Sequence, residues 1–127
     1  MTHERFNEIV NEETERIKSI LVKKQAEYNL DDDRLSHFKH AAGAANWTPE
    51  QTLLGYMTKH WVSIVDMINS KQKFTRSRFV EKVTDIENYL ILLLGLLEDD
   101  NMFLNQKVDK NKNASKTSQK QLLLENK

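Results

Sequence analysis

The stretch EKVTDIENYLILLLGLLEDD, from Glu81 to Asp100, joins a polar half to an almost unbroken apolar half. From Tyr89 to Leu97 every residue except Gly95 is large and apolar. A helix that is apolar around most of its circumference is central in a bundle or buried in a subunit interface. We therefore expect an all-α homo-oligomer, most simply a homodimer. The residues of this helix expected in the core or the interface are Leu90, Leu93, Leu94 and Leu97.

The rest of the chain has the marks of three more helices. Apolar residues recur with a helical period, and the alternating β-branched pattern of strands is missing. We expect helices over about residues 2–28, 33–45, 48–69 and 77–99. The predicted fold is a four-helix bundle, dimeric or of higher order. Residues 1–104 form the predicted helical domain, and the Lys-, Asn-, Ser- and Gln-rich residues 105–127 a disordered tail.

Helix boundaries follow from capping residues. In Thr48-Pro49-Glu50-Gln51 the threonine can cap, the proline suits the first helical position, and Gln51 completes a capping box. Thr2 is the expected cap of the first helix and Asn29 its stop. Ser77 is the expected cap of the fourth helix, and residues 31–33 offer aspartate caps for the second.

The helical period also predicts which side chains face inward. On the first helix these are Phe6, Ile9, Val10, Ile17, Ile20, Leu21 and Tyr28. On the second they are Leu35, Phe38 and Ala42, and on the third Leu53, Met57, Trp61, Ile64 and Met67 or Ile68. Glu13 interrupts the first stripe, so it must be paired or lie near a rim.

Composition narrows the class of protein. The 127 residues contain 19 Lys+Arg and 19 Asp+Glu, and the resulting formal net charge of zero makes nucleic acid an unlikely partner. No cysteine is present, which excludes thiolate metal sites and fits a reducing compartment. The longest apolar run is too short to span a bilayer, so we expect a cytoplasmic protein without membrane contact.

Two groups of polar residues are candidates for a site. Glu81, Asp85 and Asn88 fall at i, i+4 and i+7 and share one helix face. Two carboxylates one turn apart can share Mg²⁺, although a solvated helix start explains the same pattern. On the third helix Lys59, Ser63 and Asp66 share a face, with His60 beside the Trp61 stripe. An exposed polar flank is the alternative there.

The segments KKQAEYN, DRLSHFKHAA, GYMTKHWVSIVDMI and EKVTDIENYLILL carry a family resemblance between Lys23 and Leu97. The chain resembles phage and prophage proteins of the nucleotide modification associated domain group. That group is itself similar to the all-α nucleoside triphosphate pyrophosphatases of the MazG and dUTPase type. Its most specific piece is the series Glu81, Asp85, Asn88 and Tyr89 before an apolar run.

The resemblance implies an oligomeric helical bundle that handles a nucleotide with Mg²⁺. It implies that Glu81 and Asp85 are catalytic metal ligands, that Asp66 assists the metal, and that Lys59 contacts phosphate. The other substrate-binding residues that follow from it and from the helix faces are Lys24, Tyr28, His60 and Asn88.

The chain departs from the pyrophosphatase pattern in two places. Glu81 and Asp85 stand at i, i+4 where the family has i, i+3, and Lys59 and Asp66 stand where its first acidic cluster would lie. Metal catalysis needs enough ligands to fix the ion and its water, so binding survives these departures better than hydrolysis. The alternatives are a non-catalytic binder of a nucleotide or signalling molecule, such as a phage sponge against host defence, and a helical adaptor for a protein partner.

Overall fold

The computed structural model describes residues 1–23, 33–104 and 123–125, and these contain helices and no strand. The all-helical class expected from the sequence is confirmed for this part of the chain. No described helix is both long enough and apolar enough to cross a membrane. The elements in chain order are α1 (His3–Lys18), the π-helix η1 (Ser19–Lys23), α3 (Ser36–Ala45), α4 (Pro49–Asn69) and α5 (Arg76–Asp99).

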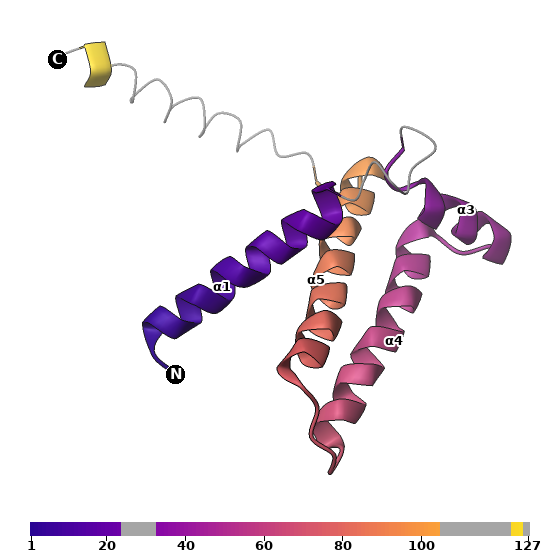
Figure 1. The fold of residues 1–127 in the computed structure, drawn as a ribbon. Coiled ribbons are helices and arrows are strands. Elements are labelled where there is room, and N and C mark those ends of the chain that lie inside the picture. Colours follow the sequence, from indigo (N-terminus) through magenta and orange to yellow (C-terminus); the bar gives the residue numbers. More distant parts are fainter. Residues whose placement is uncertain (24–32, 105–122, 126–127) are drawn as a thin grey trace.

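The two longest helices, α4 and α5, run antiparallel and side by side as a helical hairpin (Figure 1). Leu53 of α4 and Leu96 of α5 are fully buried between them, together with Phe38 of α3. Half-buried side chains surround this small core: Leu35, Tyr56, Tyr89, Leu92 and Leu93. The core therefore lies toward the end of the hairpin where α4 begins and α5 ends.

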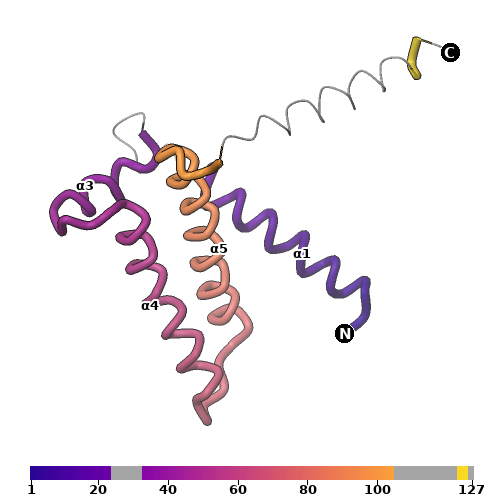
Figure 2. The backbone as a smooth tube through the Cα atoms, turned by 180° about the vertical axis from the view of Figure 1, so that it is seen from behind, coloured from indigo at the N-terminus to yellow at the C-terminus, as the bar shows by residue number. Residues whose placement is uncertain are grey.

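Helices α1 and α3 contact the hairpin without closing it on all sides. Seen from behind, the C-terminal end of α1 lies near α5, and α1 diverges from α5 toward its own N-terminus (Figure 2). The Glu13 carboxylate accepts a hydrogen bond from the Thr84 hydroxyl of α5. The segment that leads into α3 places Leu35 over Gly95, where an added Cβ would lie 3.6 Å from Leu35 Cδ1. Both contacts use the same side of α5.

Helix α4 begins as the sequence predicts. The Gln51 N–H donates to Thr48 Oγ1 over 3.1 Å, and the Thr48 N–H donates to Gln51 Oε1 over 3.0 Å, so the capping box is complete. Thr2 caps α1 by accepting from the Arg5 N–H. Each of these caps satisfies a backbone donor that the first turn leaves unpaired.

Helix α5 begins two residues earlier than predicted, because Thr75 and not Ser77 is its cap. Phe74 before the cap meets Phe79 edge-on, with ring centroids 6.2 Å apart. Contact between the residue before the cap and the fourth helical residue is a hydrophobic staple, which fixes where the chain enters a helix. This contact fixes Thr75, and not Ser77, as the cap of α5.

The second and first helices also differ from their predicted bounds. Helix α3 starts only at Ser36, because Asp33 accepts from the Leu35 N–H within a turn and no side chain caps the helix. The first helix is α-helical to Lys18 and then widens into the π-helical turn η1. The predicted stop at Asn29 lies outside the described residues, as does most of the tail, including Leu122.

Several side chains predicted to face inward are exposed. Leu53, Phe38 and Ala42 are buried as expected, and of the alternatives Met67 and Ile68 it is Met67 that is buried, whereas Trp61 is 59% exposed. On α1, Phe6 and Val10 are also exposed. The sequence pattern identifies an apolar face but does not show whether an element of the same chain covers it, and on α4 and the start of α1 none of the described elements does.

Candidate functional site

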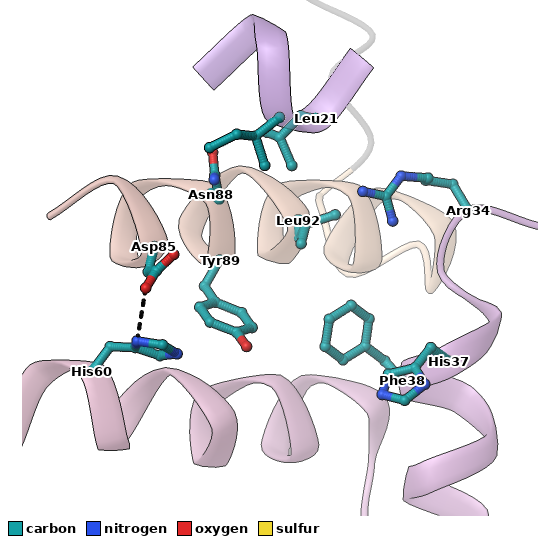
Figure 3. Close-up of a pocket in the computed structure, with 10 residues that line it drawn as sticks. Leu21, Arg34, His37, Phe38, His60, Asp85, Asn88, Tyr89 and Leu92 are labelled. Carbon is teal, nitrogen blue, oxygen red and sulfur yellow. Dashed lines mark ion pairs between the residues drawn. The ribbon is translucent and has the colours of Figure 1, made fainter. Parts of the chain in front are cut away.

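A cavity of about 510 Å³ lies where η1, α3, α4 and α5 meet. Figure 3 shows α5 across its middle, η1 above it, α4 below and the start of α3 at one end. The volume is in the roughly 300–1,000 Å³ range of small-molecule sites. The lining side chains are Ile20, Leu21, Arg34, His37, Phe38, His60, Asp85, Asn88, Tyr89 and Leu92.

One end of the cavity holds a histidine–aspartate pair that joins α4 to α5. His60 Nδ1 lies 3.1 Å from Asp85 Oδ2 (Figure 3). Burial lowers the pKa of His60, and the Asp85 carboxylate only partly offsets this by raising it. The imidazole is therefore mainly neutral at pH 7, and because Nδ1 faces the Asp85 carboxylate, this placement favours the tautomer with its proton on Nδ1. Nε2 is left as a hydrogen-bond acceptor.

Aromatic rings form much of the cavity wall. The Tyr89 ring centroid lies 5.4 Å from that of His60. Burial raises the pKa of the Tyr89 hydroxyl, and the Asp85 carboxylate adds to the increase, so this hydroxyl stays a neutral donor. Farther along the cavity, the rings of Phe38 and His37 meet edge-on with centroids 5.8 Å apart. Flat apolar surfaces of this kind suit a planar ligand ring.

Asn88 contributes a buried polar atom that has no partner among the described residues. Its side chain is 7% exposed, and Oδ1 accepts no hydrogen bond there. Most buried carbonyl groups in native structures have a partner, and a lone one costs about 1–3 kcal/mol. Asn88 lines the cavity beside Leu21, but its orphaned oxygen is itself closed to solvent, so a ligand donor would reach it only after the lining shifts.

The opposite end of the cavity carries a positive charge. Arg34 stands before α3, next to His37 and Phe38 at that end of the close-up (Figure 3). It makes no ion pair with the described residues, so its guanidinium has donors to offer. The cavity thus has an acidic end at Asp85, a cationic and aromatic end at Arg34, and an unpartnered amide in its lining.

The structure brings three of the predicted site residues together, since His60, Asp85 and Asn88 all line the cavity. Glu81 lies one turn before Asp85 with 65% of its side chain exposed, and its carboxylate is 3.8 Å from Lys82 Nζ. Lys59 is exposed beside His60, whose pKa its charge lowers. Asp66 is exposed and does not line the cavity. The predicted residues Lys24 and Tyr28 lie outside the described residues.

The predicted Mg²⁺ site is not complete within the described residues. No group of three or more His, Asp or Glu side chains converges there, and so Glu81, Asp85 and Asp66 do not form one cluster. Mg²⁺ is commonly held by one or two carboxylates together with water and substrate phosphates. Of these three carboxylates only Asp85 lines the cavity, so the described residues form no preformed Mg²⁺ cage.

A second carboxyl pair lies between α1 and α5 and was missed in the sequence. Burial, together with the neighbouring Glu13, raises the pKa of Glu87 to about 7. Burial alone would raise the pKa of Glu13 too, but hydrogen bonds from Thr84, Glu87 and Arg16 lower it overall. Near neutral pH Glu87 is therefore partly protonated beside an ionised Glu13. As expected, Glu13 is paired: Arg16 forms its ion pair.

Other cavity residues could not be found by helical spacing. Arg34 and His37 reach the cavity only because α3 packs over the hairpin, and no local pattern specifies that packing. Tyr89, one position after Asn88, had a usable signal, since a Tyr at the start of an apolar run places its hydroxyl at the polar boundary. Comparison with known proteins adds no further residues: no family model, curated protein or solved structure matches this chain.

Proposed function

We propose that the protein binds a nucleoside phosphate in the cavity between η1, α3, α4 and α5. The observation that carries the proposal is a cavity of about 510 Å³ with aromatic walls, a cationic side chain at one end and a carboxylate at the other. Ring-lined walls and charges of both signs match a ligand with a planar base and an anionic phosphate chain.

The two ends of the cavity suggest how such a ligand lies. The base fits the end where Phe38 and His37 offer ring surfaces and Arg34 offers hydrogen-bond donors. The sugar then lies beside Asn88. The phosphate chain reaches the end at His60 and Asp85, where the nearby Lys59 and Lys82 both act on His60 electrostatically.

Mg²⁺ bound to the phosphates would be held by Asp85 and Glu81 and would neutralise phosphate charge beside these carboxylates. The ion explains how an anionic chain is accepted at an acidic end of the cavity. Without it, the phosphate and the two carboxylates repel each other. Binding should therefore depend on a divalent cation. The cysteine-free sequence fits the reducing cytoplasm, where nucleotides are abundant.

Hydrolysis to a nucleoside monophosphate and pyrophosphate is the second candidate function, and the His60–Asp85 pair favours it. A neutral imidazole held by a carboxylate through Nδ1 can accept a proton at Nε2, which is the arrangement of a general base acting on water. Binding without turnover, as in a sponge, uses the same cavity. Pyrophosphate release separates these two outcomes.

The test is calorimetric titration of nucleoside triphosphates, with and without Mg²⁺, into the parent protein and two matched variants. Asp85→Asn removes the carboxylate that lines the cavity, while Asp66→Asn makes the same change on the exposed flank of α4. We expect Asp85→Asn to weaken Mg²⁺-dependent binding at least about tenfold, or ~1.4 kcal/mol. Asp66→Asn should bind like the parent.

The outcomes are distinct. Equal affinity in the parent and Asp85→Asn, with unchanged melting temperatures, would remove the cavity from the proposal. A loss confined to Asp66→Asn would place the cation on the outer flank of α4. Pyrophosphate release that His60→Asn abolishes, while binding persists, would establish the second candidate function.

A further inference from the structure

One face of α5 is apolar along nearly its whole length. Its positions recur at alternating spacings of four and three residues, which is the repeat of helices that pack as coiled coils and bundles. Two of these side chains are nearly half exposed, Val83 at 41% and Leu90 at 46%, and the others are partly buried. The face consists of Phe79, Val83, Ile86, Leu90, Leu93 and Leu97.

Helix α4 carries a second stripe with the same repeat. Trp61 is 59% and Ile68 is 67% exposed, although both stand on a helix whose adjacent face is buried against α5. No charged residue occupies any position of either stripe. The α4 stripe consists of Leu54, Thr58, Trp61, Val65 and Ile68, and the two stripes together are called the open face below.

On α5, the open face points away from α1 and from Leu35. Thr84 contacts α1 and Gly95 lies under Leu35, so these positions mark the covered side of α5. Two residues further along a helix is a rotation of about 200°. Ile86 and Leu97 are therefore on nearly the opposite side of α5. The described elements cover this side of α5 only in part: Leu93 packs against the core, whereas Val83 and Leu90 are nearly half exposed.

We propose that the open face is a dimer interface and that its occupant is a second copy of this chain. Six side chains of the open face expose large apolar surface: Leu54, Trp61, Val65, Ile68, Val83 and Leu90. The neighbouring Leu94 is a seventh. Side chains of this size and exposure present on the order of 100 Å² each, or roughly 700 Å² together, close to the about 800 Å² per partner of a standard interface.

The chemistry of the face favours a copy of itself over a partner of different composition. Because both stripes are uncharged, stacking two copies brings no like charges together, and the formal net charge of zero adds no long-range repulsion. Two α4–α5 hairpins packed through these stripes form a four-helix bundle with a two-fold axis, in which each stripe meets the same kind of helical repeat. The cavity stays outside the interface, on the covered side.

The experiment measures the mass of the full chain by sedimentation velocity across a concentration series up to tens of micromolar. We expect a dimer for the parent protein. Leu90→Glu places a charge in the centre of the open face, and we expect it to weaken dimerisation by at least about a hundredfold. The matched control is Phe6→Glu, which puts the same charge on a residue that is 56% exposed on α1; it should remain a dimer.

Fluorescence gives an independent readout of the same face. In Trp47→Phe, Trp61 is the only tryptophan, and its emission should shift to shorter wavelength as the protein dimerises. Adding Leu90→Glu should abolish that shift while the helical circular dichroism is unchanged, which shows that the monomer still folds.

Three results would overturn the proposal. A parent protein that is monomeric at every concentration would show that no second copy binds. A dimer broken by Phe6→Glu and kept by Leu90→Glu would place the interface on α1. A monomer in which Leu123→Glu shifts the Trp61 emission to longer wavelength would show that the C-terminal leucines of the same chain occupy the face.

Discussion

The two sides of the α4–α5 hairpin are opposite in chemistry and in coverage. The side covered by α1, η1 and α3 carries polar groups, among them His60, Asp85 and Asn88. The open face carries uncharged, mostly large apolar residues and is covered only in part by the described elements. A monomer that buried its surface for stability alone would show the reverse arrangement.

This inversion assigns the two proposed functions to opposite sides of the same pair of helices. Polar groups on a covered side cost stability unless they are paired, which agrees with the proposed ligand site. Apolar groups on an exposed side are typical of an interface, which agrees with the proposed dimer. Each proposed function can therefore be tested by a substitution on its own side of the hairpin.

The largest effect is expected at two adjacent leucines that lie on different faces of α4. Leu53 is fully buried in the core, whereas Leu54 is 42% exposed in the open face. Leu53→Ala should lower the free energy of unfolding by about 3 kcal/mol, because it leaves a cavity among Phe38 and Leu96. Urea titrations followed by circular dichroism measure this loss.

Leu54→Ala is the matched control for that titration. Its effect should depend on protein concentration, since the side chain is buried only when a second copy binds. At the lowest concentration the two variants should differ by most of the Leu53→Ala loss. Equal losses at every concentration would mean that both leucines are packed within one chain, and the comparison of the two faces would fail.

An intermediate effect is expected from the carboxyl pair on the covered side. The pKa of Glu87 is about 7 in the folded protein, well above that of an unfolded glutamate. The folded state therefore holds its proton more tightly, and stability falls as the pH rises from about 4.5 through 7. Glu87→Gln keeps the shape without the charge. At pH 8 it should raise the free energy of unfolding by about 1 kcal/mol.

Thermal unfolding of both proteins across this pH range provides the check. The parent should lose stability between pH 5.5 and 8 relative to Glu87→Gln, and the two curves should approach each other at the acidic end. Parallel curves over the whole range would show that Glu87 is ionised throughout, and that solvent and not Glu13 surrounds its carboxyl group.

The smallest effect is expected at the N-terminal cap of α5. Thr75→Ala removes the cap that accepts from the Arg78 N–H and should cost a little under 1 kcal/mol of stability. Ser77→Ala, two residues later and within the helix, should change stability by less than about 0.3 kcal/mol. A larger loss in Ser77→Ala would move the start of α5 to the position that its sequence first suggested.

Much of the fold could be predicted because short-range sequence patterns determine where its helices begin and end. The capping box at Thr48 and the end of α3 after Ala45 needed only neighbouring residues. The cap of α5 was missed because Thr75 and Ser77 have equal claims by residue type, and only the contact of Phe74 with Phe79 decides between them. That staple is itself a local signal, and it can be used in sequences of this kind.

The site could be predicted only where one helix face carries it. Asp85 and Asn88 followed from their spacing, and His60 from its place beside the apolar stripe of the third helix. Arg34, His37 and the pairing of Glu13 with Glu87 depend on how separate helices pack, which the sequence does not express at a fixed spacing. Exposure was the other failure: Trp61 and Phe6 belong to apolar stripes, but nothing local shows which stripes the chain itself covers.

The π-helical turn η1 changes the direction in which side chains point after the end of α1. A π-turn holds about one residue more than an α-turn, so the side chains after Lys18 are displaced by up to one residue's rotation, about 100°, from the direction that a continuous α-helix would give them. Ile20 and Leu21 reach the cavity in this displaced phase. The length of this turn therefore sets the direction of the side chains that follow it. A single-residue deletion within Ser19–Lys23 would redirect the cavity wall while leaving its composition almost unchanged.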